Sequence, residues 1–119
     1  MKKIPTGKWC YSGDGEYFSS EEYDTKEQAI TDCLADYGSG SVGEIVKLEF
    51  DENDICYDET GYHLMNVLYD EVGDVADSWE MTNKQDDELA KILAKEVVKY
   101  INEHNLQPSC FGVVNVEEV

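Results

Sequence analysis

Arginine is absent from this chain of 119 residues. All nine basic residues are lysines, against 27 Asp and Glu, which gives a formal net charge of −18. The planar guanidinium of arginine is the side chain best suited to bidentate binding of phosphate. The composition therefore argues strongly against direct binding of nucleic acid, and it disfavours an anionic membrane surface for the same reason.

Long apolar runs are also missing, because no stretch approaches the roughly 20 residues of a membrane-spanning helix. The N-terminal segment MKKIPTGKW carries lysines but lacks the apolar region of a signal peptide. We therefore expect a cytoplasmic protein that does not associate with a membrane.

Closely spaced cysteine pairs are a third absence. The four cysteines lie far apart in the sequence and form no Cys-x-x-Cys motif: Cys10, Cys33, Cys56 and Cys110. Free and mostly buried thiols are the usual state of such residues in the cytoplasm. A zinc site built from all four is the lesser alternative, because most structural zinc sites show paired, close spacings.

Motifs that carry catalysis are not found. The sequence contains no P-loop, no G-x-G-x-x-G and no G-x-S-x-G, and neither His63 nor His104 lies in a catalytic motif. The segment from Asp51 begins like a calcium loop, but Ile55 and Cys56 replace the ligand and the glycine that follow in such a loop. We expect a protein that is not an enzyme and needs no cofactor.

What the sequence does contain is clear hydrophobic periodicity. It predicts a single acidic α+β domain over residues 1–119, with about four strands in a small antiparallel or mixed sheet packed by three helices. Capping boxes at Thr25–Gln28 and Thr82–Gln85 mark two helix starts. The expected order is β-β-α-β-α-α-β, with strands at 8–12, 16–19, 42–50 and 110–116 and helices at 26–37, 62–80 and 83–104.

The segment 62–80 organises this prediction. As one helix it would bury an apolar stripe formed by Leu64, Met65, Leu68, Val72, Val75, Ala76 and Trp79. Its other side would carry Asp70, Asp74 and Asp77, with carboxylates on the order of 5–10 Å apart, a spacing similar to that of phosphates along a nucleic-acid strand. A solvated helix face is the competing interpretation. Eleven carboxylates and no lysine lie between Lys47 and Lys84.

Four short segments together resemble small acidic proteins of phages and prophages of Gram-positive bacteria. The segments are Asp24–Ile30, Val42–Val46, Glu71–Trp79 and Phe111–Glu117. The resemblance implies a phage accessory or host-interaction role in the bacterial cytoplasm, and it supplies no catalytic residues. Anti-CRISPR proteins are the functional class most similar in size and charge.

The leading hypothesis is a non-enzymatic anti-defence inhibitor that acts as a DNA mimic. Its partner would be a basic nucleic-acid-binding protein such as a Cas effector. The residues expected to bind this partner are Asp70, Glu71, Asp74, Asp77 and Glu80, with Asp51, Glu52 and Asp54 as a second patch. The alternative is a phage structural or assembly protein whose acidity serves solubility and which binds through an apolar surface. The oligomeric state is left open.

Overall fold

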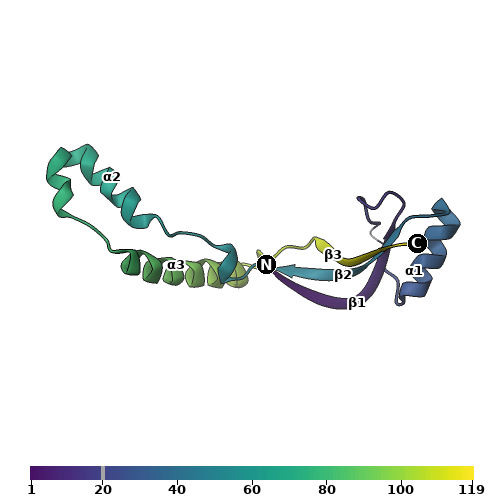
Figure 1. Ribbon diagram of the computed structural model, residues 1–119. Helices are drawn as coiled ribbons and strands as arrows, with labels where there is room; N and C mark the ends of the chain where they lie inside the picture. Colours follow the sequence, from purple (N-terminus) through teal and green to yellow (C-terminus); the bar gives the residue numbers. More distant parts are fainter. Residues whose placement is uncertain (20) are drawn as a thin grey trace. The chain divides into compact units, whose positions relative to one another are not determined.

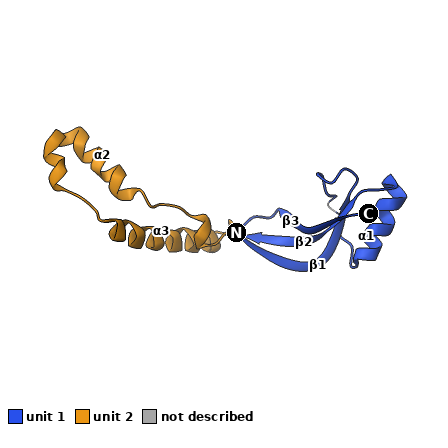
Figure 2. Ribbon diagram, in the orientation of Figure 1, with its two compact units in different colours: residues 1–49, 107–119 blue, residues 50–106 orange. Residues whose placement is uncertain are grey.

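The computed structural model describes residues 1–19 and 21–119 and is an α+β fold with a three-stranded antiparallel sheet and three α-helices (Figure 1). By its internal contacts the chain divides into two compact units, which we describe separately (Figure 2). Unit 1 comprises Met1–Glu49 and Gln107–Val119, and unit 2 comprises Phe50–Leu106. Over the described residues, no helix combines the length and the apolar character needed to cross a membrane.

The sheet of unit 1 contains β1 (Lys2–Ser12), β2 (Ser41–Glu49) and β3 (Phe111–Glu118), in the order β1-β2-β3. Both pairings are antiparallel. β2 is central, so both of its edges are paired, and the adjacent residues Ile45 and Val46, which point to opposite faces, are only 3% and 2% exposed. The alternation of apolar and polar residues over 45–50 predicts only one buried face, which the burial of both Ile45 and Val46 contradicts. β2 and β3 also approach closely: a Cβ on Gly43 would lie 2.2 Å from Cγ1 of Val113.

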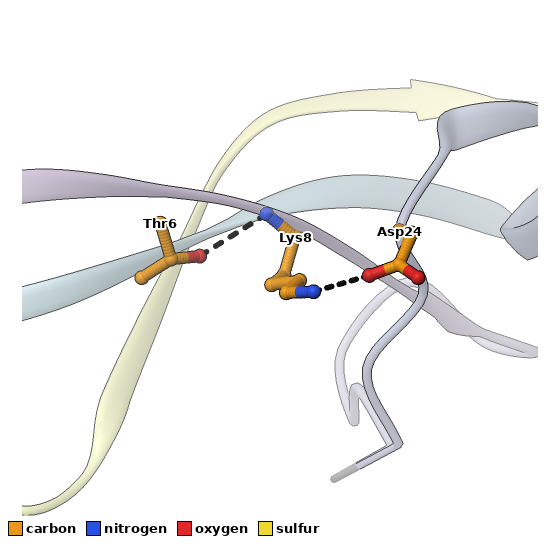
Figure 3. A network of polar contacts seen from close by, with 3 residues as sticks. All are labelled: Thr6, Lys8 and Asp24. Carbon is orange, nitrogen blue, oxygen red and sulfur yellow. Dashed lines mark hydrogen bonds and ion pairs between the residues drawn. The ribbon is translucent and has the colours of Figure 1, made fainter.

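β1 starts six residues earlier than its sequence pattern predicts and passes through an irregularity between Pro5 and Trp9. Gly7 takes a positive φ of 74°, and the Thr6 hydroxyl donates to the Ile45 carbonyl at 2.7 Å. Figure 3 shows the adjoining network, in which the Lys8 amide donates to the Thr6 hydroxyl and the Lys8 ammonium pairs with Asp24. Proline and glycine are tolerated because β1 is an edge strand with a bulge.

The helix α1 (Lys26–Tyr37) packs against β1 and β2 and completes the core of unit 1. Its bounds match the sequence prediction. The Thr25 side chain accepts from the Gln28 amide, and Gly38 ends the helix with a φ of 75°. Ala29 and Cys33 are fully buried against Tyr11 and Val42.

The expected return strand at 16–19 is not formed. The Asp14 carboxylate accepts from the amides of Glu16 and Tyr17 at 2.8 and 2.9 Å. These two donors are therefore not available for a strand ladder, and within 16–19 the amide of Ser19 is the one that donates to β1, at the Tyr11 carbonyl. The sheet has three strands instead of about four, and the order is β-α-β-α-α-β.

Unit 2 is helical. It contains the 3₁₀ helices η1 (Glu52–Asp54) and η2 (Gly73–Ser78) and the α-helices α2 (Thr60–Val72) and α3 (Asn83–Glu103). The α3 start has the predicted capping box: Thr82 and Gln85 exchange two hydrogen bonds of 3.0 and 3.2 Å. The buried Gly61 amide donates to Asp86 of α3 at 2.8 Å and so ties the start of α2 to the first turn of α3.

The single helix expected over residues 62–80 is wrong. Gly73 has φ 64° and ψ −139°, and the chain leaves α2 there and continues as the 3₁₀ helix η2. An α-helix needs negative φ at every residue, whereas glycine reaches this region without a Cβ clash. The expected apolar stripe is consequently not buried as a whole: Ala76 is 1% exposed, whereas Val72 and Val75 are 49% and 74% exposed.

Candidate binding surface

The five carboxylates predicted to bind a partner lie at and after the end of α2. Asp70 and Glu71 are in the last turn of α2, Asp74 and Asp77 are in η2, and Glu80 follows Trp79. All five are exposed. We call this group the η2 acidic surface. Because Gly73 interrupts the helix, its members do not form the predicted row along one helical face.

Most members of the η2 acidic surface are held by no other side chain. Within residues 1–19 and 21–119, Asp70, Glu71 and Asp74 have no ion-pair or side-chain hydrogen-bond partner. Asp77 differs, because it accepts a hydrogen bond from the Tyr69 hydroxyl. That contact connects η2 back to α2 and gives Asp77 a structural role.

In the second predicted patch, Asp51, Glu52 and Asp54, two of the three carboxylates make hydrogen bonds that stabilise the start of η1. Asp51 accepts from the Asn53 amide and donates its own amide to Asp54, both at 2.9 Å, which completes a capping box on η1. Glu52 is exposed. Since capping occupies oxygens of Asp51 and Asp54, Glu52 is the carboxylate of this patch best placed for a partner.

The charged side chains between Lys47 and Lys84 are all carboxylates. Of the eleven carboxylates between Lys47 and Lys84, nine are exposed, the exceptions being the half-buried Glu49 and Asp51. No lysine or arginine interrupts the stretch. Exposed charges of one sign add to a local field that attracts cationic surfaces and repels polyanions.

Apolar side chains lie among these carboxylates. Tyr62 is 69% exposed, Val67 is 49% exposed and Val75 is 74% exposed. Large exposed aromatic and aliphatic groups are typical of protein interfaces, where tyrosine is enriched. The region therefore offers both charge and apolar contact area to a protein partner.

The cysteines do not gather into a metal site. Over the described part of the chain, no three His, Cys, Asp or Glu side chains are placed to hold a metal ion. Cys10 and Cys33 are fully buried in unit 1, where burial raises the pKa of the Cys10 thiol to about 11. Cys56 is exposed and its thiol lies 3.5 Å from an oxygen of Asp58, beside a hollow of about 340 Å³ that His63 also lines.

Sequence reasoning missed a second acidic group, on unit 1. It surrounds Tyr23 in a hollow of about 430 Å³ lined by Glu22, Asp24, Glu27 and Asp32. Burial and hydrogen bonds to Asp32 and Glu21 raise the pKa of Tyr23, so its hydroxyl stays neutral. Glu22 and Asp24 precede α1, and Glu27 and Asp32 lie on it. The spacing of the last two, i and i+5, does not place them on one helical face, so the sequence does not indicate an acidic cluster here.

Comparison with protein-family models, with curated proteins and with solved structures found no match for the chain. The resemblance to phage proteins therefore stays a prediction.

Proposed function

We propose that the chain is a non-enzymatic anti-defence inhibitor, of the anti-CRISPR kind, that covers a positively charged nucleic-acid-binding surface of a host protein. The observation that carries the proposal is the set of nine exposed carboxylates between Lys47 and Lys84, a stretch that contains no lysine or arginine. A surface that binds nucleic acid is rich in lysine and arginine, so it is complementary to such a field.

The break at Gly73 changes how this mimicry would work. Asp70, Asp74 and Asp77 cannot reproduce the regular spacing of phosphates along one helix. The proposal therefore rests on total charge and on exposed apolar neighbours such as Tyr62, and does not require a phosphate-by-phosphate match. Electrostatic attraction would raise the association rate, and salt would lower it.

The test is a charge-reversed variant, Asp70→Lys/Glu71→Lys/Asp74→Lys, which leaves the Asp77–Tyr69 contact in place. Its matched control, Glu16→Lys/Glu27→Lys/Glu118→Lys, makes the same change of net charge at exposed positions of unit 1. Each protein is immobilised and exposed to bacterial lysate at about 0.05 and 0.5 M NaCl, conditions that differ several-fold in screening length. Bound proteins are identified by mass spectrometry.

We expect the unaltered chain and the control variant to retain a nucleic-acid-binding protein at low salt, and added duplex DNA to release it. The charge-reversed variant should lose that protein. Equal capture by the charge-reversed variant would refute the proposal.

A structural or assembly role for a phage is the second candidate. It is favoured by the exposed apolar side chains of unit 2, among them Val67, Val72 and Val75. This role requires capture of virion proteins that persists at high salt, because burial of apolar area does not depend on charge. The same experiment, carried out with lysate of phage-infected cells so that virion proteins are present, distinguishes the two roles.

A further inference from the structure

The helix α3 has a face that unit 2 leaves uncovered. η1 and α2 both contact α3, and the buried side of this helix is marked by Ala94, which is 5% exposed. Away from that side, Ile92 and Tyr100 are 58% and 57% exposed. Leu89, Leu93 and Val97 are only half-buried. The apolar stripe of α3 is therefore wider than the surface that covers it.

Two hollows follow one another along this face. The first, of about 430 Å³, is lined by Trp79, Met81, Leu89 and Ile92 together with Glu80 and Glu88. The second, of about 390 Å³, is lined by Leu93, Val97 and Tyr100 together with Glu96, Lys99 and Glu103. We call these two hollows the α3 groove. From Gln85 to Tyr100 it extends about 22 Å at a rise of about 1.5 Å per residue, the length of a helix of about 15 residues.

The charges that border the α3 groove are nearly all negative. Glu80, Glu88, Glu96 and Glu103 line it, and its one lysine, Lys99, lies 3.9 Å from Glu103. The remaining lysines of α3 are Lys84, Lys91 and Lys95. At about 100° per residue these three lie roughly 100–140° around the helix from Glu96 but within about 60° of Glu88. A segment lying in the groove would therefore meet Glu96 and Glu103 among the apolar side chains, and would meet Glu88 together with lysines along one margin.

We propose that the α3 groove binds a cationic amphipathic helix of a partner protein. Apolar side chains of that helix would enter the two hollows, and its lysines or arginines would lie beside Glu88 and Glu96. This is the helix-in-groove mode of recognition, with charge complementarity setting the choice of partner. A second copy of the chain is a poor occupant, because residues 50–106 carry four lysines against fifteen carboxylates. The inference concerns a surface that shares only Glu80 with the η2 acidic surface, so it does not depend on the inhibitor function.

The experiment uses the full chain and a labelled synthetic peptide of 18 residues. The probe has leucines at i, i+3, i+4 and i+7 and lysines elsewhere, and the control peptide is a scramble of the same composition. Binding is measured by fluorescence anisotropy at about 0.15 M NaCl, where long-range attraction is screened. We expect the amphipathic peptide to bind about tenfold or more tightly than the scramble, because only it presents an apolar face to the hollows.

Variants locate the binding. Ile92→Ser/Tyr100→Ser should reduce the ratio of the affinities for the amphipathic and scrambled peptides to near unity. Glu96→Lys is a second, independent variant of the groove and should also lower this ratio. Val75→Ser alters a 74% exposed residue outside the groove and should leave the preference unchanged. The Asp70→Lys/Glu71→Lys/Asp74→Lys variant should weaken both peptides alike and keep their ratio, so this test and that of the inhibitor function can fail separately.

Three outcomes would overturn the proposal. The first is equal affinity of the chain for the two peptides. The second is an unchanged preference in both groove variants. The third is a dimer in analytical ultracentrifugation that Ile92→Ser/Tyr100→Ser dissociates, because a second copy would then be the occupant of the groove.

Discussion

Asp14 shows how one side chain can decide local topology. Its carboxylate accepts from two backbone amides and from the hydroxyl of Ser12, itself 2% exposed. The hydrogen bonds that the backbone amides of Tyr17 and Glu16 donate lower the pKa of Asp14 below its usual value. The turn at Gly13–Gly15 was predictable from its residue types, but the capture of both amides, which removes the expected strand, depends on where the carboxylate points.

At the residue scale we predict that Asp14→Ala lowers the midpoint of thermal unfolding by several degrees at pH 6. A carboxyl whose pKa is lowered in the folded protein stabilises it above the unfolded pKa of about 3.9, and this contribution is lost as the pH falls through the folded value. The difference between Asp14→Ala and the unaltered chain should therefore shrink below about pH 4.

Asp14→Asn is the matched control, because its amide oxygen can still accept from Glu16 and Tyr17. It should be less destabilised than Asp14→Ala at pH 6. A difference between Asp14→Ala and the unaltered chain that stays constant from pH 6 to pH 3 would contradict the role assigned to the ionised carboxylate.

At the scale of elements, unit 2 is organised by the break between α2 and η2. The Gly61–Asp86 hydrogen bond and the Tyr69–Asp77 contact hold the two ends of this region, and Gly73 supplies the backbone conformation between them. The periodicity of residues 62–80 gives no warning of the break, because a single glycine is compatible with a helix at a cost of about 1 kcal/mol.

We predict that Gly73→Ala lowers the free energy of unfolding by about 1–3 kcal/mol, since alanine is strained at a φ of 64° and a ψ of −139°. Urea unfolding followed by circular dichroism measures the change. Val75→Ala, an exposed neighbour in η2, should stay within about 0.5 kcal/mol of the unaltered chain. An unchanged free energy with increased helical signal would mean that residues 60–80 form the continuous helix expected from the sequence.

At the scale of the whole molecule, the net charge of −18 sets the balance between solubility and self-repulsion. Over residues 1–19 and 21–119, lysine pairs with three of the carboxylates. Lys8–Asp24, Lys26–Glu117 and Lys99–Glu103 form ion pairs, and the partners of all three are exposed or half-buried. Such pairs contribute little to stability, so most of the repulsion stays uncompensated.

We therefore predict that added salt raises the midpoint of thermal unfolding. Between about 0.02 and 0.3 M NaCl the screening length falls several-fold, which weakens repulsion among the carboxylates. The Glu16→Lys/Glu27→Lys/Glu118→Lys variant, with a net charge of −12, should show a smaller rise. A midpoint that falls with salt would indicate that the ion pairs outweigh the repulsion.

The sequence by itself determined the features that depend on near neighbours. The starts of α1 and α3 follow from Thr25 and Thr82, whose hydroxyls accept from amides three residues later. The end of α1 follows from Gly38, and the residue with positive φ after α3 is Asn105, a residue type that tolerates this conformation. The acidic character of the surface was also evident, since charge is a property of composition.

Only the tertiary structure decided which residues pair, which are covered and where the carboxylates lie. Lys2–Pro5 belongs to a strand because its partner is Val46–Glu49, more than forty residues later in the chain. The apolar stripe around Val72 and Val75 is exposed because no element of unit 2 covers it. Pairing and burial depend on the distant element that supplies the other surface, whereas capping needs only a hydroxyl and an amide a few residues apart.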